Sequence, residues 1–196
     1  MKLNLANKIT LLRILLVPLI IVLLYFEGPV FCVLAVCAFG FASLTDWVDG
    51  YIARRRNMVT SMGKFLDPLA DKVLICSVLI MFVHLRWAPA WVVIIMVCRE
   101  LVVTGLRAIA MDEGIVLAAD KFGKAKTVLQ ICAIIPLTLH YPYWGHELWR
   151  LGEWLLYLAM LMSIFSCINY CMGFYGKQRK QASAAAEKLH TDDPRA

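Results

Sequence analysis

Residues 154–176 read WLLYLAMLMSIFSCINYCMGFYG and contain no Asp, Glu, Lys or Arg. A helix that crosses a bilayer needs about 20 mostly apolar residues, so this stretch is long enough to span a membrane. It belongs to a chain of 196 residues that is 61% hydrophobic and 17% charged, with a mean hydropathy of +0.71. Soluble domains are usually about 45–50% apolar and about 25% charged. The composition therefore excludes disorder, a collagen-like fibre and an ordinary cytosolic domain, and it predicts a polytopic membrane protein.

Five further stretches without charged residues precede this one. They are 14–26, 28–45, 73–85, 87–98 and 127–146. The first four are shorter than a full span and must recruit flanking residues that carry charge. We therefore predict an all-α fold of six transmembrane helices. Their expected ranges are 8–26, 29–56, 67–86, 88–112, 123–141 and 149–175.

The two ends of the chain need separate readings. The first helix has a basic start, like a signal peptide, but no small-x-small cleavage site follows it, so we expect it to stay uncleaved. Residues 1–176 are predicted to form one transmembrane domain. Residues 177–196 are polar and rich in alanine, and they predict a frayed helix end followed by a disordered tail.

The basic residues determine the expected orientation. If the N-terminus is cytoplasmic, 18 of the 20 Lys and Arg residues fall on the inner side, and only Arg86 and Arg150 fall outside. We therefore expect both termini in the cytoplasm. This asymmetry also accounts for the net charge of +6 and the pI of about 9.0, so nucleic acid is not expected as a partner.

Four acidic residues interrupt the apolar pattern in TDWVDGYIARRRNMVTSMGKFLDPLADK, residues 45–72. Asp46 and Asp49 are spaced i, i+3, while Asp67 and Asp71 are spaced i, i+4, so each pair shares one helix face. Asp46 lies about 26 Å along a helix from Pro29, near the inner boundary of a hydrocarbon layer roughly 30 Å thick. Two helix ends at the same depth are therefore expected to bring the four carboxylates together.

Carboxylates in an apolar layer are costly and indicate a functional site. Four of them cannot all stay ionised side by side without a cation. Oxygen ligands suit Mg²⁺, Mn²⁺ or Ca²⁺, and the lack of nearby His or Cys argues against zinc. Two divalent ions held by four carboxylates are typical of phosphoryl chemistry.

The residues beside the aspartates are small or basic. Gly50 and Ala53 lie at i+4 and i+7 from Asp46, and Gly63 lies one turn before the second pair. A flat ligand could approach the helix backbone there, with Arg54 supplying positive charge for phosphate oxygens. The alternatives are that the small residues serve helix packing and that the acids line a cation path, as in a channel or transporter.

Written with its gaps, the segment is Asp46-x2-Asp49-Gly50-x2-Ala53-Arg54-x8-Gly63-x3-Asp67-x3-Asp71. It resembles the signature of the CDP-alcohol phosphatidyltransferase family at every position. The resemblance implies a six-helix bundle that forms a homodimer, with its site open to the cytoplasmic leaflet. It also implies that an acceptor hydroxyl attacks the lipid-linked phosphorus of a CDP-alcohol and releases CMP.

The same resemblance implies roles for the signature residues. Two Mg²⁺ or Mn²⁺ ions would be held by the four aspartates, and Asp71 would also act as the general base. Gly50, Ala53, Arg54 and Gly63 would bind the CDP-lipid. Asn7-x2-Thr10-x2-Arg13 resembles the opening of bacterial members and adds Asn7 and Thr10 to that lipid site.

Two later segments resemble acceptor segments of bacterial members that make phosphatidylglycerophosphate. They are Arg99-Glu-Leu-Val-Val-Thr-Gly-Leu-Arg107 and Gly123-Lys-Ala-Lys-Thr127. The implied reaction moves the phosphatidyl group of CDP-diacylglycerol to sn-glycerol 3-phosphate, giving phosphatidylglycerophosphate and CMP at the inner membrane. It is a step of phospholipid biosynthesis.

The residue types in these segments agree with an anionic acceptor. Arg99 and Arg107 are eight residues apart and lie near one helix face, while Lys124 opens the next predicted helix. Three cations and a helix N-terminus suit a dianionic phosphate, although Lys124 and Lys126 also fit an ordinary inner loop. Because an arginine in the membrane needs a partner, we expect Glu100 to pair with it or with a neighbouring helix.

Other acceptors remain open within the family. They are inositol phosphate, phosphatidylglycerol, serine and choline. Inositol phosphate also needs a basic pocket, whereas a lipid acceptor such as phosphatidylglycerol leaves the three cations harder to explain. The remote alternative is the cation channel or transporter.

Overall fold

The computed structural model describes residues 5–56, 61–112, 121–143 and 145–191. All regular elements in these ranges are helices, which confirms the all-α prediction and the number of helices in the described chain. They are α1 (Leu5–Tyr25), α2 (Pro29–Arg56), α3 (Ser61–His84), α4 (Ala90–Asp112), α5 (Lys121–Thr138) and α6 (Leu148–Thr191).

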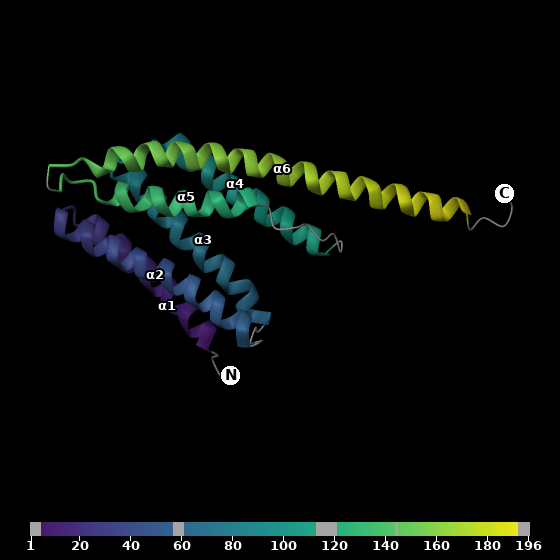
Figure 1. The fold of residues 1–196 in the computed structure, drawn as a ribbon, viewed down its shortest axis with the longest axis horizontal. Helices are drawn as coiled ribbons and strands as arrows, with labels where there is room; N and C mark the ends of the chain where they lie inside the picture. The colour runs from purple at the N-terminus through teal and green to yellow at the C-terminus, as the bar shows by residue number, and fades with distance from the viewer. Residues whose placement is uncertain (1–4, 57–60, 113–120, 144, 192–196) are drawn as a thin grey trace.

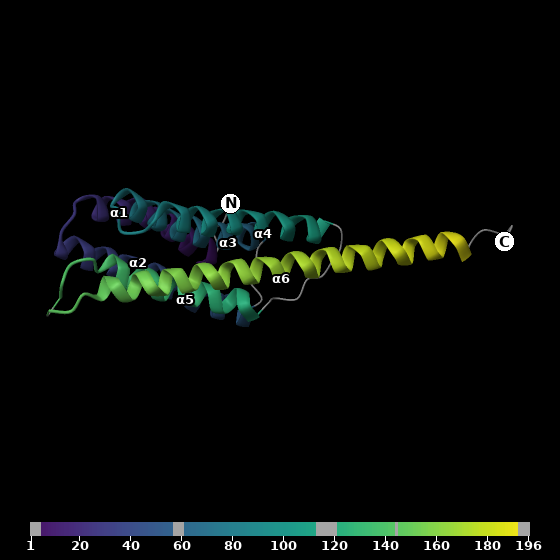
Figure 2. The same ribbon diagram turned by 90° about the horizontal axis from the view of Figure 1, so that it is seen from above.

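Successive helices run in opposite directions (Figure 1). The connections 26–28, 85–89 and 139–147 therefore lie together at one end of the bundle, where α1 meets α2, α3 meets α4, and α5 meets α6. The starts of α1, α3 and α5 and the ends of α2, α4 and α6 belong to the opposite end (Figures 1 and 2). We call the first end the turn end and the second the terminal end. Arg86 and Arg150, predicted to lie apart from all other basic residues, are both at the turn end.

The turn after α3 shows how the sequence reverses the chain. Arg86 has a φ of 61°, and its amide donates to the carbonyl of Val83 at 3.1 Å, while the amide of Trp87 donates to the carbonyl of Phe82 at 2.8 Å. This pair of hydrogen bonds around a left-handed residue is the Schellman motif, which satisfies the last carbonyls of a helix. Proline then fixes the start of the next helix at both α2 and α4, as Pro29 and Pro89.

The apolar core fills the half of the bundle next to the turn end. Helix α6 packs against α5 and α4, and α1 packs against α2 and α3. The largest fully buried apolar side chains are Ile20, Leu24, Phe39, Leu74, Val78, Leu79, Phe82, Met96, Ile134, Leu137 and Leu156. Toward the terminal end, buried polar side chains, among them Arg99, Lys126 and Ser166, lie beside a small second apolar cluster of Ala110 and Phe174. The polar side chains make the candidate site.

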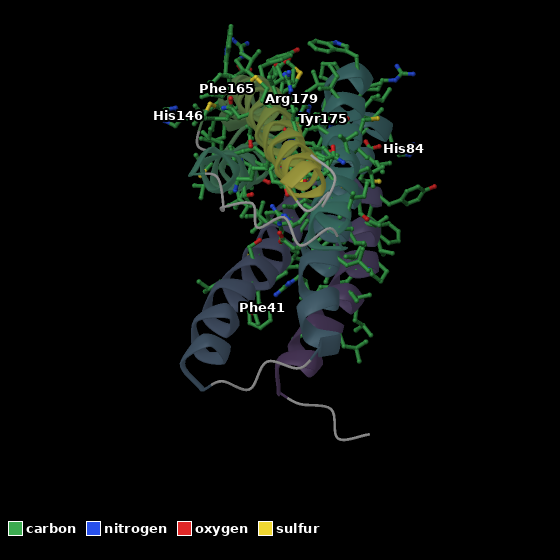
Figure 3. The ribbon with its side chains drawn as sticks, turned by 90° about the vertical axis from the view of Figure 1, so that its right-hand side faces the viewer. Phe41, His84, His146, Phe165, Tyr175 and Arg179 are labelled. Carbon is green, nitrogen blue, oxygen red and sulfur yellow. The ribbon has the colours of Figure 1, made fainter. Side chains whose placement is uncertain are left out.

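The outer surfaces of the helices are strongly apolar. Leu15, Leu101 and Trp154 are 67%, 68% and 76% exposed, and Figure 3 labels further exposed aromatic side chains, Phe165 and Tyr175 of α6. Among the described residues, one helical stretch, Leu148–Arg179, is long and apolar enough by length and composition to cross a membrane. Shorter apolar stretches occupy Leu11–Tyr25, Pro29–Thr45 and Ala125–Thr138. The six-span topology therefore stays a prediction.

Most helix boundaries fall within three residues of those expected, and two differ by more. Helix α3 begins at Ser61 rather than at 67, because helix formation tolerates Lys64 even though an apolar span does not. Helix α6 continues to Thr191, through the part of the chain expected to be a frayed end and a disordered tail. The segment after Lys177 is rich in alanine, the strongest helix former, and its next proline is Pro194.

Candidate active site

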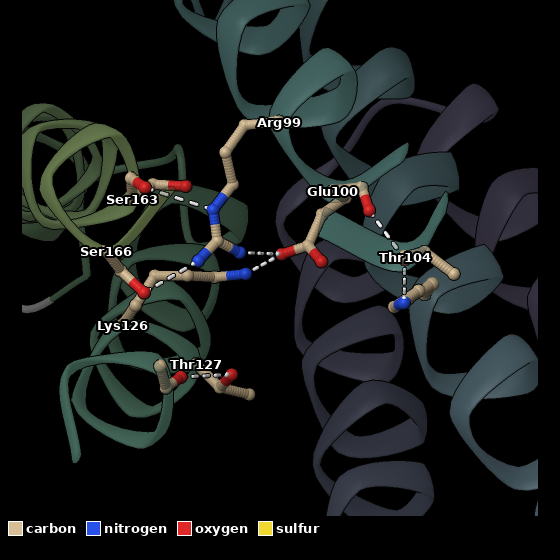
Figure 4. Close-up of polar contacts among 9 residues, drawn as sticks. Arg99, Glu100, Thr104, Lys126, Thr127, Ser163 and Ser166 are labelled. Atoms are coloured by element: carbon tan, nitrogen blue, oxygen red, sulfur yellow. Dashed lines mark hydrogen bonds and ion pairs between the residues drawn. The ribbon is translucent and has the colours of Figure 1, made fainter. Parts of the chain in front are cut away.

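Two neighbouring residues of α4, Arg99 and Glu100, form the centre of a buried polar cluster. Their side chains are 8% and 13% exposed, and Arg99 Nη1 donates to Glu100 Oε1 at 3.0 Å. Arg99 Nε donates to the carbonyl of Ser163, and Nη2 donates to Ser166 Oγ, each at 3.0 Å (Figure 4). All three guanidinium nitrogens are thus engaged, and α4 is joined to α6. The expectation that Glu100 pairs with Arg99 is confirmed.

The same carboxylate also binds a lysine from another helix. The Lys126 ammonium of α5 forms an ion pair with Glu100 Oε1, and the lysine side chain is only 5% exposed (Figure 4). Removing a lone charge from water is costly, so burial of this ammonium requires such a partner. One carboxylate therefore faces two cations, which leaves this part of the site with excess positive charge.

A third connection joins α4 to α3. The Thr104 hydroxyl donates to the backbone carbonyl of Glu100 at 2.6 Å and accepts a hydrogen bond from Lys72 Nζ (Figure 4). Lys72 follows Asp71 on α3. Little more than one turn of α4 thus contacts three other helices through polar groups.

Arg107 lies two turns beyond Glu100 on α4, and its side chain is exposed. Its guanidinium carbon is 5.9 Å from the ring centroid of Tyr170 on α6, a distance at which a cation is attracted by an aromatic face. Arg107 is therefore positioned beside the cluster while remaining open to a ligand.

The predicted general base is close to these cations. Asp71 is partly buried on α3, and its charge acts on the ammonium groups of Lys72 and Lys126. The charges of Arg99 and Arg107 act on Lys72 as well. Three of the predicted site residues, Asp71, Arg99 and Arg107, therefore all act electrostatically on Lys72.

The other predicted site residues lie on described helices, although their side chains are outside the described part of the structure. Asn7 and Thr10 are near the start of α1; Asp46, Asp49, Gly50, Ala53 and Arg54 near the end of α2; Gly63 and Asp67 near the start of α3; Lys124 near the start of α5. These segments all belong to the terminal end (Figure 1). Among the described side chains, no group of three His, Cys, Asp or Glu could hold a metal, so the metal set stays a prediction.

Comparison with known proteins identifies the family. A family model described as CDP-alcohol phosphatidyltransferase matches residues 3–165, which include every candidate residue named above except Ser166 and Tyr170. The chain belongs to the CDP-alcohol phosphatidyltransferase family.

Relatives within this family are similar over nearly their whole length. A protein of Bacillus subtilis (strain 168) named CDP-diacylglycerol--glycerol-3-phosphate 3-phosphatidyltransferase is 43% identical over 179 residues, covering 85% of this chain and 93% of its own. Proteins with the same name from Rickettsia bellii (strain RML369-C) and Haemophilus influenzae (strain ATCC 51907 / DSM 11121 / KW20 / Rd) are 36% and 33% identical. They match 85% and 87% of this chain, and 93% and 92% of their own lengths.

The sequence interpretation of this CDP-alcohol phosphatidyltransferase family member missed four residues of the polar cluster. Lys126 fitted an ordinary inner loop, and Lys72, Ser163 and Ser166 received no role. The available signal was polar residues inside apolar helices, because hydroxyl groups on membrane helices commonly form hydrogen bonds between helices. Ser166 follows this rule, because its hydroxyl accepts a hydrogen bond from Arg99. Ser163, one turn before it, contributes its backbone carbonyl instead of its hydroxyl, so its residue type gave no signal.

Proposed function

We propose that this chain transfers the phosphatidyl group of CDP-diacylglycerol to sn-glycerol 3-phosphate, yielding phosphatidylglycerophosphate and CMP. The observation that carries the proposal is a group of four cations, Lys72, Arg99, Arg107 and Lys126, that interact electrostatically with one another, two of which, Lys72 and Lys126, also feel the charge of Asp71. A surplus of positive charge beside one carboxylate suits an anionic acceptor whose hydroxyl must lose a proton. The family provides the reaction class, and the names of the relatives provide the acceptor.

The charge of the cluster separates the candidate acceptors. Glycerol 3-phosphate and inositol phosphate each bring a phosphate that an arginine can bind with two hydrogen bonds. Serine and choline bring no phosphate. Phosphatidylglycerol brings only a phosphodiester with one negative charge, which links its headgroup to the lipid. Of the two remaining acceptors, glycerol 3-phosphate is the one that the relatives' names contain.

The donor lipid and its metals are assigned to the ends of α2 and α3. Asp46 and Asp49 are one turn apart on α2, and Asp67 and Asp71 are one turn apart on α3. The end of α2 and the start of α3 both belong to the terminal end. Four carboxylates and no His or Cys between them form a donor set that fits Mg²⁺ or Mn²⁺. When bound, two such ions would neutralise the diphosphate and stabilise charge that develops on the transferred phosphorus and on CMP.

The protein's own groups bind and orient the reactants. Gly50, Ala53 and Gly63 would leave room for the nucleotide against the backbone, with Arg54, Asn7 and Thr10 around it. Arg107 and Lys124, beside the buried Arg99, would bind the acceptor phosphate.

The reaction forms one bond and breaks one. The 1-hydroxyl oxygen of glycerol 3-phosphate attacks the lipid-linked phosphorus of the donor, and the bond from that phosphorus to the bridging oxygen breaks, so that CMP leaves with the electron pair. Asp71 accepts the hydroxyl proton. Such a base contributes about 10²–10⁴-fold, because an alcohol is hardly ionised at neutral pH.

The proposal includes a location. All six helices would cross a bacterial inner membrane, with the terminal end at the cytoplasmic side. The apolar outer surfaces support this placement, and so does the basic composition of the terminal end. The lipid chains of the donor would stay in the bilayer while the soluble acceptor enters from the cytosol. We further propose that the enzyme acts as a homodimer, as the family resemblance implies.

One assay tests the proposed reaction. Purified protein in detergent–lipid micelles is incubated with CDP-diacylglycerol, Mg²⁺ or Mn²⁺, and one acceptor at a time: glycerol 3-phosphate, inositol phosphate, phosphatidylglycerol, serine or choline. CMP release and the lipid product are measured, with the Asp71→Asn variant as the background. We expect phosphatidylglycerophosphate with glycerol 3-phosphate alone. Product with another acceptor, and none with glycerol 3-phosphate, would replace the proposed substrate.

A further inference from the structure

The carboxylate of Glu100 lies at the meeting point of three helices. Its Oε1 accepts a hydrogen bond from Arg99 of the same helix, α4, and forms an ion pair with Lys126 of α5. Arg99 in turn is hydrogen-bonded to α6. The side chains of Arg99, Glu100 and Lys126 are 8%, 13% and 5% exposed. Their charges are therefore shielded from water and interact strongly. Glu100 is also the one acidic residue of α4 apart from Asp112 at its end.

Arg99 is held in place independently of Glu100. Its Nε and Nη2 donate to the carbonyl of Ser163 and the hydroxyl of Ser166. The guanidinium therefore stays against α6 and has no nitrogen left without a partner. Each nitrogen therefore has a protein partner, and the guanidinium acts on a ligand mainly through its charge.

Lys126 depends more strongly on Glu100. The pair with Glu100 is the ion pair described for its ammonium; Arg99 and Lys72 repel the ammonium, and Asp71 attracts it without a described contact. The pair therefore fixes the first two turns of α5, which begins at Lys121, against the middle of α4. Lys124 lies on this segment of α5, and Arg107 lies two turns along α4 from Glu100.

We propose that Glu100 is a positioning residue of the acceptor site. It does not touch the substrate. Helices α4 and α5 each pack on α6, and the ion pair between Glu100 and Lys126 then holds the start of α5 toward α4, so that Lys124 and Arg107 face the acceptor phosphate together. This inference rests on the proposed function for its substrate. An error of about 1 Å in such a clamp can lower kcat/KM on the order of 10²-fold.

The test compares Glu100→Gln, Lys126→Met and the double variant. Kinetics are measured by CMP release with each substrate varied in turn. For each variant we expect KM for glycerol 3-phosphate to rise at least about tenfold, with kcat and KM for CDP-diacylglycerol changed by less than about threefold. We expect the double variant to be no worse than either single variant, because both break the same ion pair. Glu100→Asp keeps the charge and should recover part of the affinity.

A matched control removes an acid from another ion pair. Glu147 Oε2 pairs with Arg150 Nε at 2.6 Å at the turn end, and Glu147→Gln should leave both KM values unchanged. A larger effect of Lys126→Met than of Glu100→Gln would overturn the proposal, since it would mean that Lys126 binds the phosphate itself. A normal or lowered KM in Glu100→Gln would do so too.

A folding defect and a different acceptor can each be distinguished from a loss of positioning. If a single variant fails to elute as a folded protein in size-exclusion chromatography, the double variant, which leaves neither charge unpaired, decides: a wild-type KM would overturn the positioning role. If the unaltered enzyme uses another acceptor, the proposed substrate fails, and the same comparison with that acceptor still tests Glu100.

Discussion

Gly152 of α6 lies so close to the backbone of Leu137 of α5 that no side chain fits between them. A β-carbon at Gly152 would lie 2.5 Å from the amide nitrogen of Leu137 and 2.8 Å from its α-carbon. Backbone atoms cannot yield as the end of a flexible side chain can. The absence of a β-carbon at Gly152 therefore allows a close approach of α5 and α6. Helix α5 carries Lys126, and α6 carries Ser163 and Ser166, which accept hydrogen bonds from Arg99.

Gly152→Ala should accordingly destabilise the protein. Overpacking of this kind typically costs about 1–3 kcal/mol, and a lowered thermal unfolding midpoint in detergent would reveal it. Gly176→Ala is the matched control on the same helix, because nothing lies within 4 Å of the added carbon. If both variants unfold at the same temperature, the close approach has no energetic weight.

Arg107→Ala should weaken acceptor binding selectively. Arg107 is exposed beside Tyr170 and is open to a ligand, so its loss should raise KM for glycerol 3-phosphate much more than KM for CDP-diacylglycerol. Arg150→Ala removes the same charge at the turn end and should change neither constant. An equal rise in both constants in Arg107→Ala would mean general damage rather than loss of a phosphate contact.

Asp71→Asn should abolish turnover while leaving a folded protein. The amide is similar in size but cannot accept the proton, and the expected loss in kcat is at least about 10²–10⁴-fold. CMP release measures this, and size-exclusion chromatography checks the fold. A rate close to that of the unaltered enzyme would remove Asp71 as the base.

Removal of divalent cations should stop the reaction reversibly. Treatment with EDTA is expected to eliminate CMP release, and added Mg²⁺ or Mn²⁺ should restore it, because four aspartates need a cation to bind the diphosphate. Asp46→Asn or Asp49→Asn should raise the metal concentration needed for half-maximal activity. Full activity in EDTA would contradict a metal-dependent mechanism.

The orientation can be tested with trypsin. If the terminal end lies in the cytoplasm, trypsin should cut after Lys177 or Arg179 in inside-out vesicles. The cut should shorten the chain by a small C-terminal piece. The same residues should be protected in right-side-out vesicles, where Arg86 and Arg150 are the basic residues on the accessible side. Cleavage near Lys177 in right-side-out vesicles would reverse the topology.

The sequence predicts α2 to the residue, because Pro29 and the run Arg54–Arg56 mark its two ends. It misplaces the start of α3 and the end of α6, because the absence of charge was used as the sign of a helix. Charge-free length reports where a helix can contact lipid, whereas Lys64 and the alanines after Lys177 are fully compatible with a helix outside it.

The candidate site shows a similar division. The motif spacing indicates the aspartates and the arginines of α4, and the cost of a buried arginine predicts a partner such as Glu100. It cannot indicate that Lys126, rather than a residue of α3 or α6, shares that carboxylate. That choice depends on the rotation and spacing of α5 against α4, which arise from packing of the whole bundle.

The length of α6 has a practical consequence for attaching labels. From Gly176 to Thr191 the helix rises about 22 Å, at about 1.5 Å per residue, and it projects past the other helices (Figure 1). A fluorescent protein or affinity tag joined to the C-terminus is therefore held away from the acceptor cations on a stiff spacer. One joined to the N-terminus would be attached fewer than ten residues from Asn7 and Thr10, where it would obstruct the entry of the nucleotide into the proposed site.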